Sequence, residues 1–171
     1  MSACGLDFGT SNTTLGLARR GQSPALAPLE GDDVTIPSAI FFDWSSNAVI
    51  GRAAVAAYVD GAQGRLLRSL KSALGNSLID ETTQVGRKRL RFTQVIACYL
   101  EALKGRAEAA AGEPLTQVVH GRPVHFVDGD PEGDRKAEDA LREIALSIGF
   151  KDVSFQFEPI AAALDYEQQV K

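Results

Sequence analysis

The C-terminal third of the chain alternates between short apolar runs and helical patterns, and this alternation restricts the fold more than any other feature. Residues 118–123 and 153–157 have the apolar character of strands. Asp130-Pro131 and Glu158-Pro159 are typical helix starts, since a carboxylate suits the first turn and proline is tolerated there. Strands that alternate with helices predict parallel neighbours in one sheet. The first of these helices has an apolar face at helical spacing, formed by Ala137, Leu141, Ile144 and Ile148.

The N-terminal part of the chain has strand patterns divided by glycine and small polar residues. Residues 3–8, 13–18 and 25–29 predict a three-stranded antiparallel meander. Residues 38–42 and 48–50 predict a further strand and a shorter partner. The expected fold class is therefore α/β, with a mixed sheet in which the β-meander is followed by parallel strands, flanked by helices.

The middle of the chain is predominantly helical in pattern. Residues 51–58 and 66–74 predict two helices, whereas residues 75–91 are polar and predict irregular structure. Thr93 is a good N-cap for a long helix that ends at Gly112. Its apolar face consists of Val95, Ile96, Tyr99, Leu100, Leu103 and Ala107.

Composition excludes several classes of function. The 171 residues suffice for one domain with a sizeable core, and 18 basic against 22 acidic residues give a net charge of −4. This balance argues against a nucleic-acid or membrane-surface binder. Cys4 and Cys98 have no metal-ligand spacing, and the chain shows neither a signal peptide nor an apolar run long enough to span a bilayer. The expected location is the cytoplasm.

The turn after the first strand is the candidate for chemistry. Its glycines allow close approach of a phosphate to backbone N–H groups, and the hydroxyls and amide that follow add donors. Asp7, at the end of the strand, is placed to hold a magnesium ion through water, because magnesium keeps much of its hydration shell. An ordinary hairpin remains the alternative interpretation of these residues. The candidate nucleotide-binding residues are Gly9, Thr10, Ser11 and Asn12.

Several segments, in order along the chain, resemble the DnaK-like chaperones, the seventy-kilodalton heat-shock family. The turn at residues 5–12 resembles their first phosphate loop, and residues 35–42 resemble their Thr-Pro-Ser strand. Residues 70–75 resemble a Lys-Arg-Leu-Ile-Gly stretch, residues 118–126 the strand with the switch proline, and residues 157–163 the Asn-Glu-Pro-Thr-Ala-Ala-Ala connection. The Gly-Arg-Pro sequence before the switch position, and Phe-Glu-Pro in place of Asn-Glu-Pro, are closer to the YegD-like branch of that family.

The resemblance implies a role for each matching residue. Lys71 matches the catalytic lysine, and Glu158 matches a carboxylate that positions the nucleophile or a magnesium-bound water, with Asp7 as their catalytic neighbour. Pro123 and Arg135 match the relay that reports which nucleotide is bound. From the residues alone, a solvated helix lysine is the favoured interpretation of Lys71. Glu158 is also consistent with a helix N-terminal carboxylate, and Pro123 is only a strand terminator.

The resemblance also implies the fold family and the activity. Residues 1–171 are expected to form the first lobe of an actin-like, ribonuclease-H-like ATPase domain, with the second lobe and its adenosine pocket absent from this sequence. ATP and Mg are the implied cofactors, with hydrolysis in the full-length parent and an inactive isolated lobe. Client polypeptides and co-chaperones are implied partners through other regions, and the isolated lobe has an edge strand through which it could dimerise. An actin-like filament protein and a sugar or small-acid kinase of the same superfamily remain alternatives.

Overall fold

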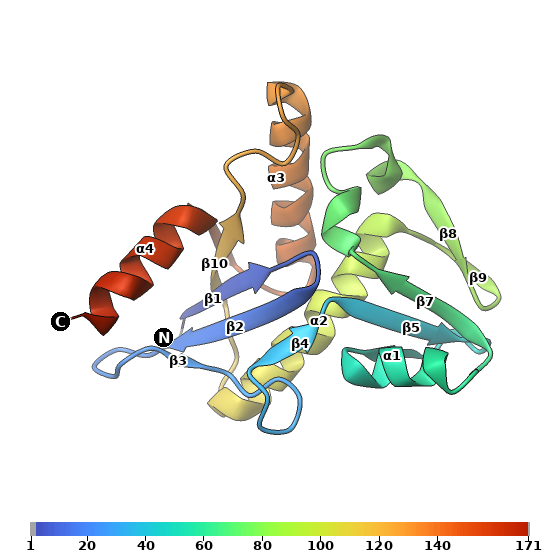
Figure 1. The fold of residues 1–171 in the computed structure, drawn as a ribbon, viewed down its shortest axis with the longest axis horizontal. Coiled ribbons are helices and arrows are strands. Elements are labelled where there is room, and N and C mark those ends of the chain that lie inside the picture. Colours follow the sequence, from blue (N-terminus) through green and yellow to red (C-terminus); the bar gives the residue numbers. More distant parts are fainter. Residues whose placement is uncertain (1–2, 171) are drawn as a thin grey trace.

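The computed structural model describes residues 3–170, which form a mixed α/β unit built on one large sheet (Figure 1). The strands of this sheet lie in the order β11-β10-β1-β2-β3, and β4 also pairs with β2. β1 (Ala3–Phe8) is antiparallel to β2 (Asn12–Ala18) and parallel to β10 (Gln117–Arg122), which is in turn parallel to β11 (Asp152–Phe157). The prediction of a mixed sheet flanked by helices is confirmed.

The antiparallel side of the sheet is shorter than the sequence predicts. β3 comprises only Ala25–Leu26, and β4 (Thr35–Pro37) pairs with the other half of the same edge of β2. β5 (Ala39–Asp43) and β6 (Ala48–Ile50) pair as expected but belong to a second sheet, whose third strand is β7 (Gly64–Arg68). α1 (Arg52–Val59) packs on this second sheet.

The predicted helix over residues 66–74 is wrong. Leu66 and Leu67 lie in β7 opposite Phe41 and Ile40 of β5, so their apolar side chains add to a strand pair. Gly64 makes this pairing possible, because a Cβ there would lie 2.2 Å from the carbonyl oxygen of Phe42. The helical pattern survives only as the short 3₁₀ helix η1 (Leu70–Ala73).

Residues 75–91 are more regular than predicted. They contain the short 3₁₀ helix η2 (Ser77–Asp80) and a hairpin of β8 (Thr82–Val85) and β9 (Lys88–Arg91). α2 (Phe92–Ala111) follows directly, so it begins one residue before the predicted cap Thr93. It ends as expected at Gly112, whose φ of 71° is the left-handed conformation that glycine adopts freely.

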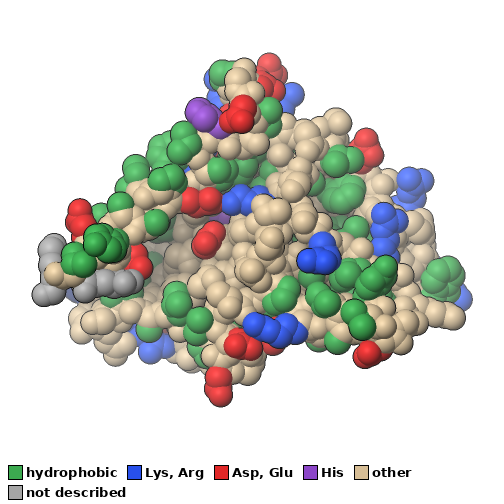
Figure 2. All heavy atoms as spheres, viewed as in Figure 1, with side chains coloured by type: hydrophobic (Ala, Val, Ile, Leu, Met, Phe, Trp, Pro, Cys, Tyr) green, Lys and Arg blue, Asp and Glu red, His purple; other side chains and the backbone are tan. Residues whose placement is uncertain are grey.

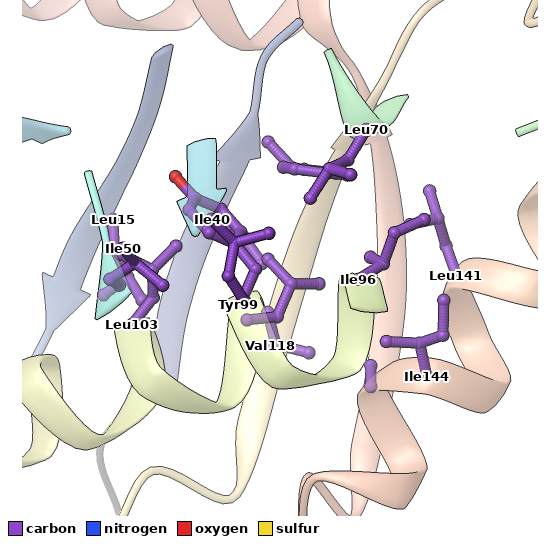
Figure 3. Packing of buried hydrophobic residues seen from close by; sticks show 14 of the residues in the cluster. Leu15, Ile40, Ile50, Leu70, Ile96, Tyr99, Leu103, Val118, Leu141 and Ile144 are labelled. Atoms are coloured by element: carbon purple, nitrogen blue, oxygen red, sulfur yellow. The ribbon is translucent and has the colours of Figure 1, made fainter. Parts of the chain in front are cut away.

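The core lies on the face of the large sheet covered by α2 and α3 (Pro131–Ser147). Alternate residues of β1 point into this core, while Gly5 and Asp7 face the opposite side, next to α4 (Glu158–Gln169). Figure 3 shows side chains of α2, α3 and both sheets meeting in one cluster. The labelled members of this cluster are Leu15, Ile40, Ile50, Leu70, Ile96, Tyr99, Leu103, Val118, Leu141 and Ile144.

Candidate functional site

Lys71 is positioned by the short helix η1, which follows β7, the last strand of the second sheet. Leu70 and Leu74, on either side of it, are almost fully buried and anchor this turn in the core. Ser69 has a φ of 55°, a left-handed conformation that ends β7 and redirects the chain. The lysine is therefore held at a rigid corner and not on a regular solvated helix.

The Lys71 ammonium forms an ion pair with Glu158, the first residue of α4. Nζ and Oε1 are 2.5 Å apart, and the Lys71 side chain is only 12% exposed. The two residues are 87 positions apart in the sequence and follow strands of different sheets, Lys71 after β7 and Glu158 after β11. Since Lys71 is largely shielded from water, this contact is an organised pair and not a surface encounter.

The turn at Gly9–Asn12 is fixed by Ser38, which lies between β4 and β5. The Ser38 hydroxyl donates to the carbonyl oxygen of Gly9 (2.7 Å), and its N–H donates to that of Ser11 (2.8 Å). Gly9 is required by the tight turn, because a Cβ there would lie 2.2 Å from the carbonyl oxygen of Asn12. Within residues 3–170, Thr10 makes no hydrogen bond and is exposed, so its N–H and hydroxyl are available to a ligand.

Asp7 lies beside the Lys71–Glu158 ion pair, on the open face of β1. Burial and the neighbouring Glu158 carboxylate raise the pKa of Asp7, and the Lys71 ammonium opposes this rise. Gly121 leaves room for the arrangement, since a Cβ there would lie 3.3 Å from the Leu6 carbonyl oxygen and 3.5 Å from Glu158 Cγ. The charges of Asp7, Lys71 and Glu158 are thus close enough to influence one another.

Two adjoining hollows share Glu158. One, of about 580 Å³, is lined by Thr10, Lys71 and Pro123 among others. The other, of about 520 Å³, is lined by Asp7, Gly121 and the α4 residues Ala161 and Ala162 among others. Figure 2 shows acidic and basic side chains side by side in the depression next to α4.

The structure brings most of the sequence-predicted residues together. Thr10, Lys71, Pro123 and Glu158 line one hollow, Asp7 lines the next, and the rest of the turn adjoins Thr10. Arg135 is separate from them, since it is an exposed residue of α3 whose side chain has no ion pair or hydrogen bond in the described part of the chain. Its role in a relay with Pro123 stays a prediction.

Sequence reasoning missed three residues around the site. Arg122, directly before Pro123, is the cation that bonds to the Pro123 carbonyl oxygen and to α3. Ser38 fixes the glycine turn, and only its place in the Thr-Ile-Pro-Ser motif pointed to it. His120 is a fully buried residue of β10, and no sequence pattern distinguishes it from an apolar strand residue.

His120 is held as a neutral imidazole. Its ring lies between Phe8 and Phe155, and Nδ1 is 2.8 Å from the Gly121 carbonyl oxygen, an arrangement in which Nδ1–H donates. Nε2 is buried and has no partner among the described residues. Burial lowers the pKa of His120 to about 4, because the charged form would lose its hydration.

The described residues contain no group of three or more histidine, cysteine or acidic side chains arranged to hold a metal ion. A magnesium ion at Asp7 would accordingly be held by few protein ligands, with water and substrate oxygens completing its shell, as is usual for this ion. The carboxylates of Asp7 and Glu158 outnumber the single Lys71 ammonium, so the local charge suits a cation.

The coupling between the three charged groups gives a direct prediction. Glu158→Gln should lower the pKa of Asp7, because it removes a negative neighbour and frees Lys71; Lys71→Ala should raise it. Titration of the Asp7 carboxyl carbon by NMR, without magnesium, measures both shifts. Glu108→Gln, which breaks the Lys104–Glu108 pair on α2 (2.6 Å), is the matched control and should leave Asp7 unchanged. Equal pKa values in all three variants would show that Asp7 is electrostatically separate.

Comparison with known proteins shows which proteins the chain is similar to in sequence. No protein-family model matches the chain. "Chaperone protein HscA homolog" of Colwellia psychrerythraea is 29% identical over 96% of the chain, which covers 28% of that protein. "Chaperone protein DnaK 3" of a Synechococcus strain is 27% identical over 95% of the chain, which covers 26% of that protein.

These relatives confirm the resemblance to DnaK-like chaperones that the motifs indicate, along nearly the whole chain. The chain spans about a quarter of the length of these curated relatives. Among the described residues, no helix is long and apolar enough to cross a membrane.

Proposed function

We propose that this chain is the first lobe of an actin-like ATPase of the DnaK-like chaperone type, and that it binds the phosphates and magnesium of ATP. The observation that carries the proposal is the partly buried Lys71–Glu158 pair beside the fixed glycine turn. Both relatives carry chaperone names, which favours a chaperone over a filament protein or a small-molecule kinase. Gly121-Arg122-Pro123 and Phe157 favour the YegD-like branch.

In this proposal each residue has a limited task. The N–H groups and hydroxyls of the Gly9–Asn12 turn hold phosphate oxygens, and Lys71 stabilises the charge on the transferred phosphoryl group and orients the attacking water. Asp7 holds hydrated magnesium, which neutralises phosphate charge. Glu158 holds Lys71 in place and accepts a hydrogen bond from water. The adenosine contacts, any client polypeptide and any co-chaperone belong to regions beyond these residues, and we place the protein in the cytoplasm.

An NMR titration of residues 1–171 tests the phosphate half of this proposal. Mg-ATP and magnesium triphosphate should both shift the amide signals of the Gly9–Asn12 turn, with millimolar or weaker affinity, whereas adenosine alone should not. Gly9→Ala should abolish the effect, because its Cβ forces the turn open. Gly105→Ala, on α2, is the matched control, since nothing lies within 4 Å of the added Cβ.

Two results would contradict the proposal. If triphosphate shifts no signal of the turn, the turn is not a phosphate site. If Mg-ATP binds with micromolar affinity, these residues hold a complete nucleotide site and the assignment of a single lobe is wrong.

A further inference from the structure

Arg122 connects the end of β10 to α3 through two carboxylates. Its Nη2 lies 2.7 Å from Asp134 Oδ2, and its Nη1 pairs with Glu138 one turn further along the helix. The Arg122 side chain is only 12% exposed. A planar guanidinium can bond to two carboxylates at once in this way, which a lysine ammonium does less well.

The same guanidinium holds the segment that follows β10. Nε donates to the Pro123 carbonyl oxygen at 3.1 Å, and the Phe126 ring lies 5.1 Å from the Arg122 Cζ. Asp134 accepts the N–H of Phe126 on its other oxygen. This segment lines the hollow that contains Lys71, so Arg122 fixes one wall of the candidate site.

Arg122 also reaches the start of α4. Its Cζ lies 5.2 Å from the centre of the Phe157 ring, and the two residues are direct partners in the register of β10 and β11. Phe157 is the N-cap residue of α4, and Glu158 follows it. The position of the Phe157 backbone therefore sets the position of the Glu158 carboxylate relative to Lys71.

Arg122 and Phe157 are the last residues of β10 and β11, and their side chains are in contact. We propose that Arg122 is a positioning residue for the Lys71–Glu158 pair, because its guanidinium links Phe157, and through it Glu158, to the carboxylates of α3. Its effect on turnover rests on the proposed function, whereas its effect on the ion pair does not.

The matched control for Arg122 is Arg142. Its guanidinium also stacks on a ring of β11, 4.8 Å from the centre of Phe155, and also pairs with Glu138 (3.4 Å). It differs from Arg122 in that Phe155 is not adjacent to Glu158. Loss of Arg142 therefore removes the same kind of contact without releasing α4.

NMR of the ammonium groups tests the inference without nucleotide. An ion-paired, shielded ammonium exchanges its protons slowly with water and gives a visible signal, and Lys104, paired with Glu108, serves as an internal reference. Arg122→Gln should shift or broaden the Lys71 signal and leave that of Lys104 unchanged, and Arg122→Lys should give an intermediate effect. Arg142→Gln should change neither signal. An unchanged Lys71 signal in folded Arg122→Gln would overturn the inference.

A second variant guards against loss of folding. Removing Arg122 leaves Asp134 and Glu138 without their cation, which could destabilise the chain. Phe157→Ala keeps these ion pairs and changes a side chain that is 40% exposed, so the fold should be retained. It should affect the Lys71 signal in the same way as Arg122→Gln, and a Lys71 signal like that of the wild type would also overturn the inference.

Kinetics of the full-length protein give the second readout. Arg122→Gln and Phe157→Ala should lower kcat for ATP by about tenfold to a hundredfold, as expected when a catalytic group is misplaced by about an ångström, with KM little changed. Arg142→Gln should retain wild-type kcat. If the wild-type protein hydrolyses no ATP, the proposed function fails, and the Lys71 signal alone decides whether Arg122 positions the pair.

Discussion

Replacing Lys71 with alanine in the full-length protein should reduce ATP turnover by about 10²–10³-fold while leaving the affinity for Mg-ATP nearly unchanged. The lysine is a compact charge held 2.5 Å from Glu158 at the edge of the hollow beside the glycine turn. A charge in this position contributes most where negative charge develops on the transferred phosphoryl group. In the proposed function, ground-state binding depends instead on the turn and on the adenosine contacts. Single-turnover hydrolysis and equilibrium binding of the nucleotide, measured on the same preparation, separate the two effects.

Lys104→Ala is the matched control for this substitution. Lys104 is as buried as Lys71, at 13% exposure, and forms an ion pair of similar length, but it lies on α2. The Lys104→Ala variant should retain ATP turnover even if the protein becomes less stable. Unchanged turnover in Lys71→Ala would remove this residue from the mechanism. Equal losses of turnover and affinity would show that it only binds the nucleotide.

The stability of the chain should fall by about 3 kcal/mol between pH 6.5 and pH 4 because of His120 alone. The pKa of His120 is lowered from 6.5 to about 4 in the folded protein. Between these two values the unfolded chain binds a proton that the folded chain excludes, so the free energy of unfolding rises with pH. Well above pH 6.5 the imidazole is neutral in both states and contributes no pH dependence. Urea unfolding of residues 1–171 at a series of pH values measures the slope.

His120→Asn isolates this contribution. The asparagine amide can donate to the Gly121 carbonyl oxygen as Nδ1 does, but it does not titrate. The difference in slope between wild type and variant therefore reports His120 and excludes carboxylates such as Asp134, whose pKa is lowered by the Phe126 N–H. Parallel curves for the two proteins between pH 6.5 and pH 4 would show that the imidazole is accessible to protons in the folded state.

The sequence predicted the elements whose signals are local. Gly112 and Asp130-Pro131 delimit helices as expected, because left-handed glycine and side-chain capping act within a few residues. The strand at Gly64–Arg68 was missed because two adjacent leucines fit a helix face and a strand equally well. Only its pairing with β5, distant in the sequence, decides between them.

The site was predictable in its residues but not in its contacts. Lys71 and Glu158 were found through motifs, but their ion pair joins residues 87 positions apart, and no local pattern encodes such a contact. Arg122 was overlooked because its carboxylate partners lie 12 and 16 positions further along the chain. Its role appears only when α3 brings Asp134 and Glu138 to it.

The two sheets divide the site between them. Ser38, which fixes the glycine turn, directly precedes β5 of the second sheet, and Lys71 follows β7, the last strand of that sheet. Glu158 instead follows β11 of the large sheet. If the second sheet tilts against the large sheet, Lys71 moves together with the second sheet and away from Glu158. The separation of Nζ and Oε1 is thus a gauge of the angle between the sheets, and a pair of fluorescent labels on β6 and β11 would follow the same motion from the surface.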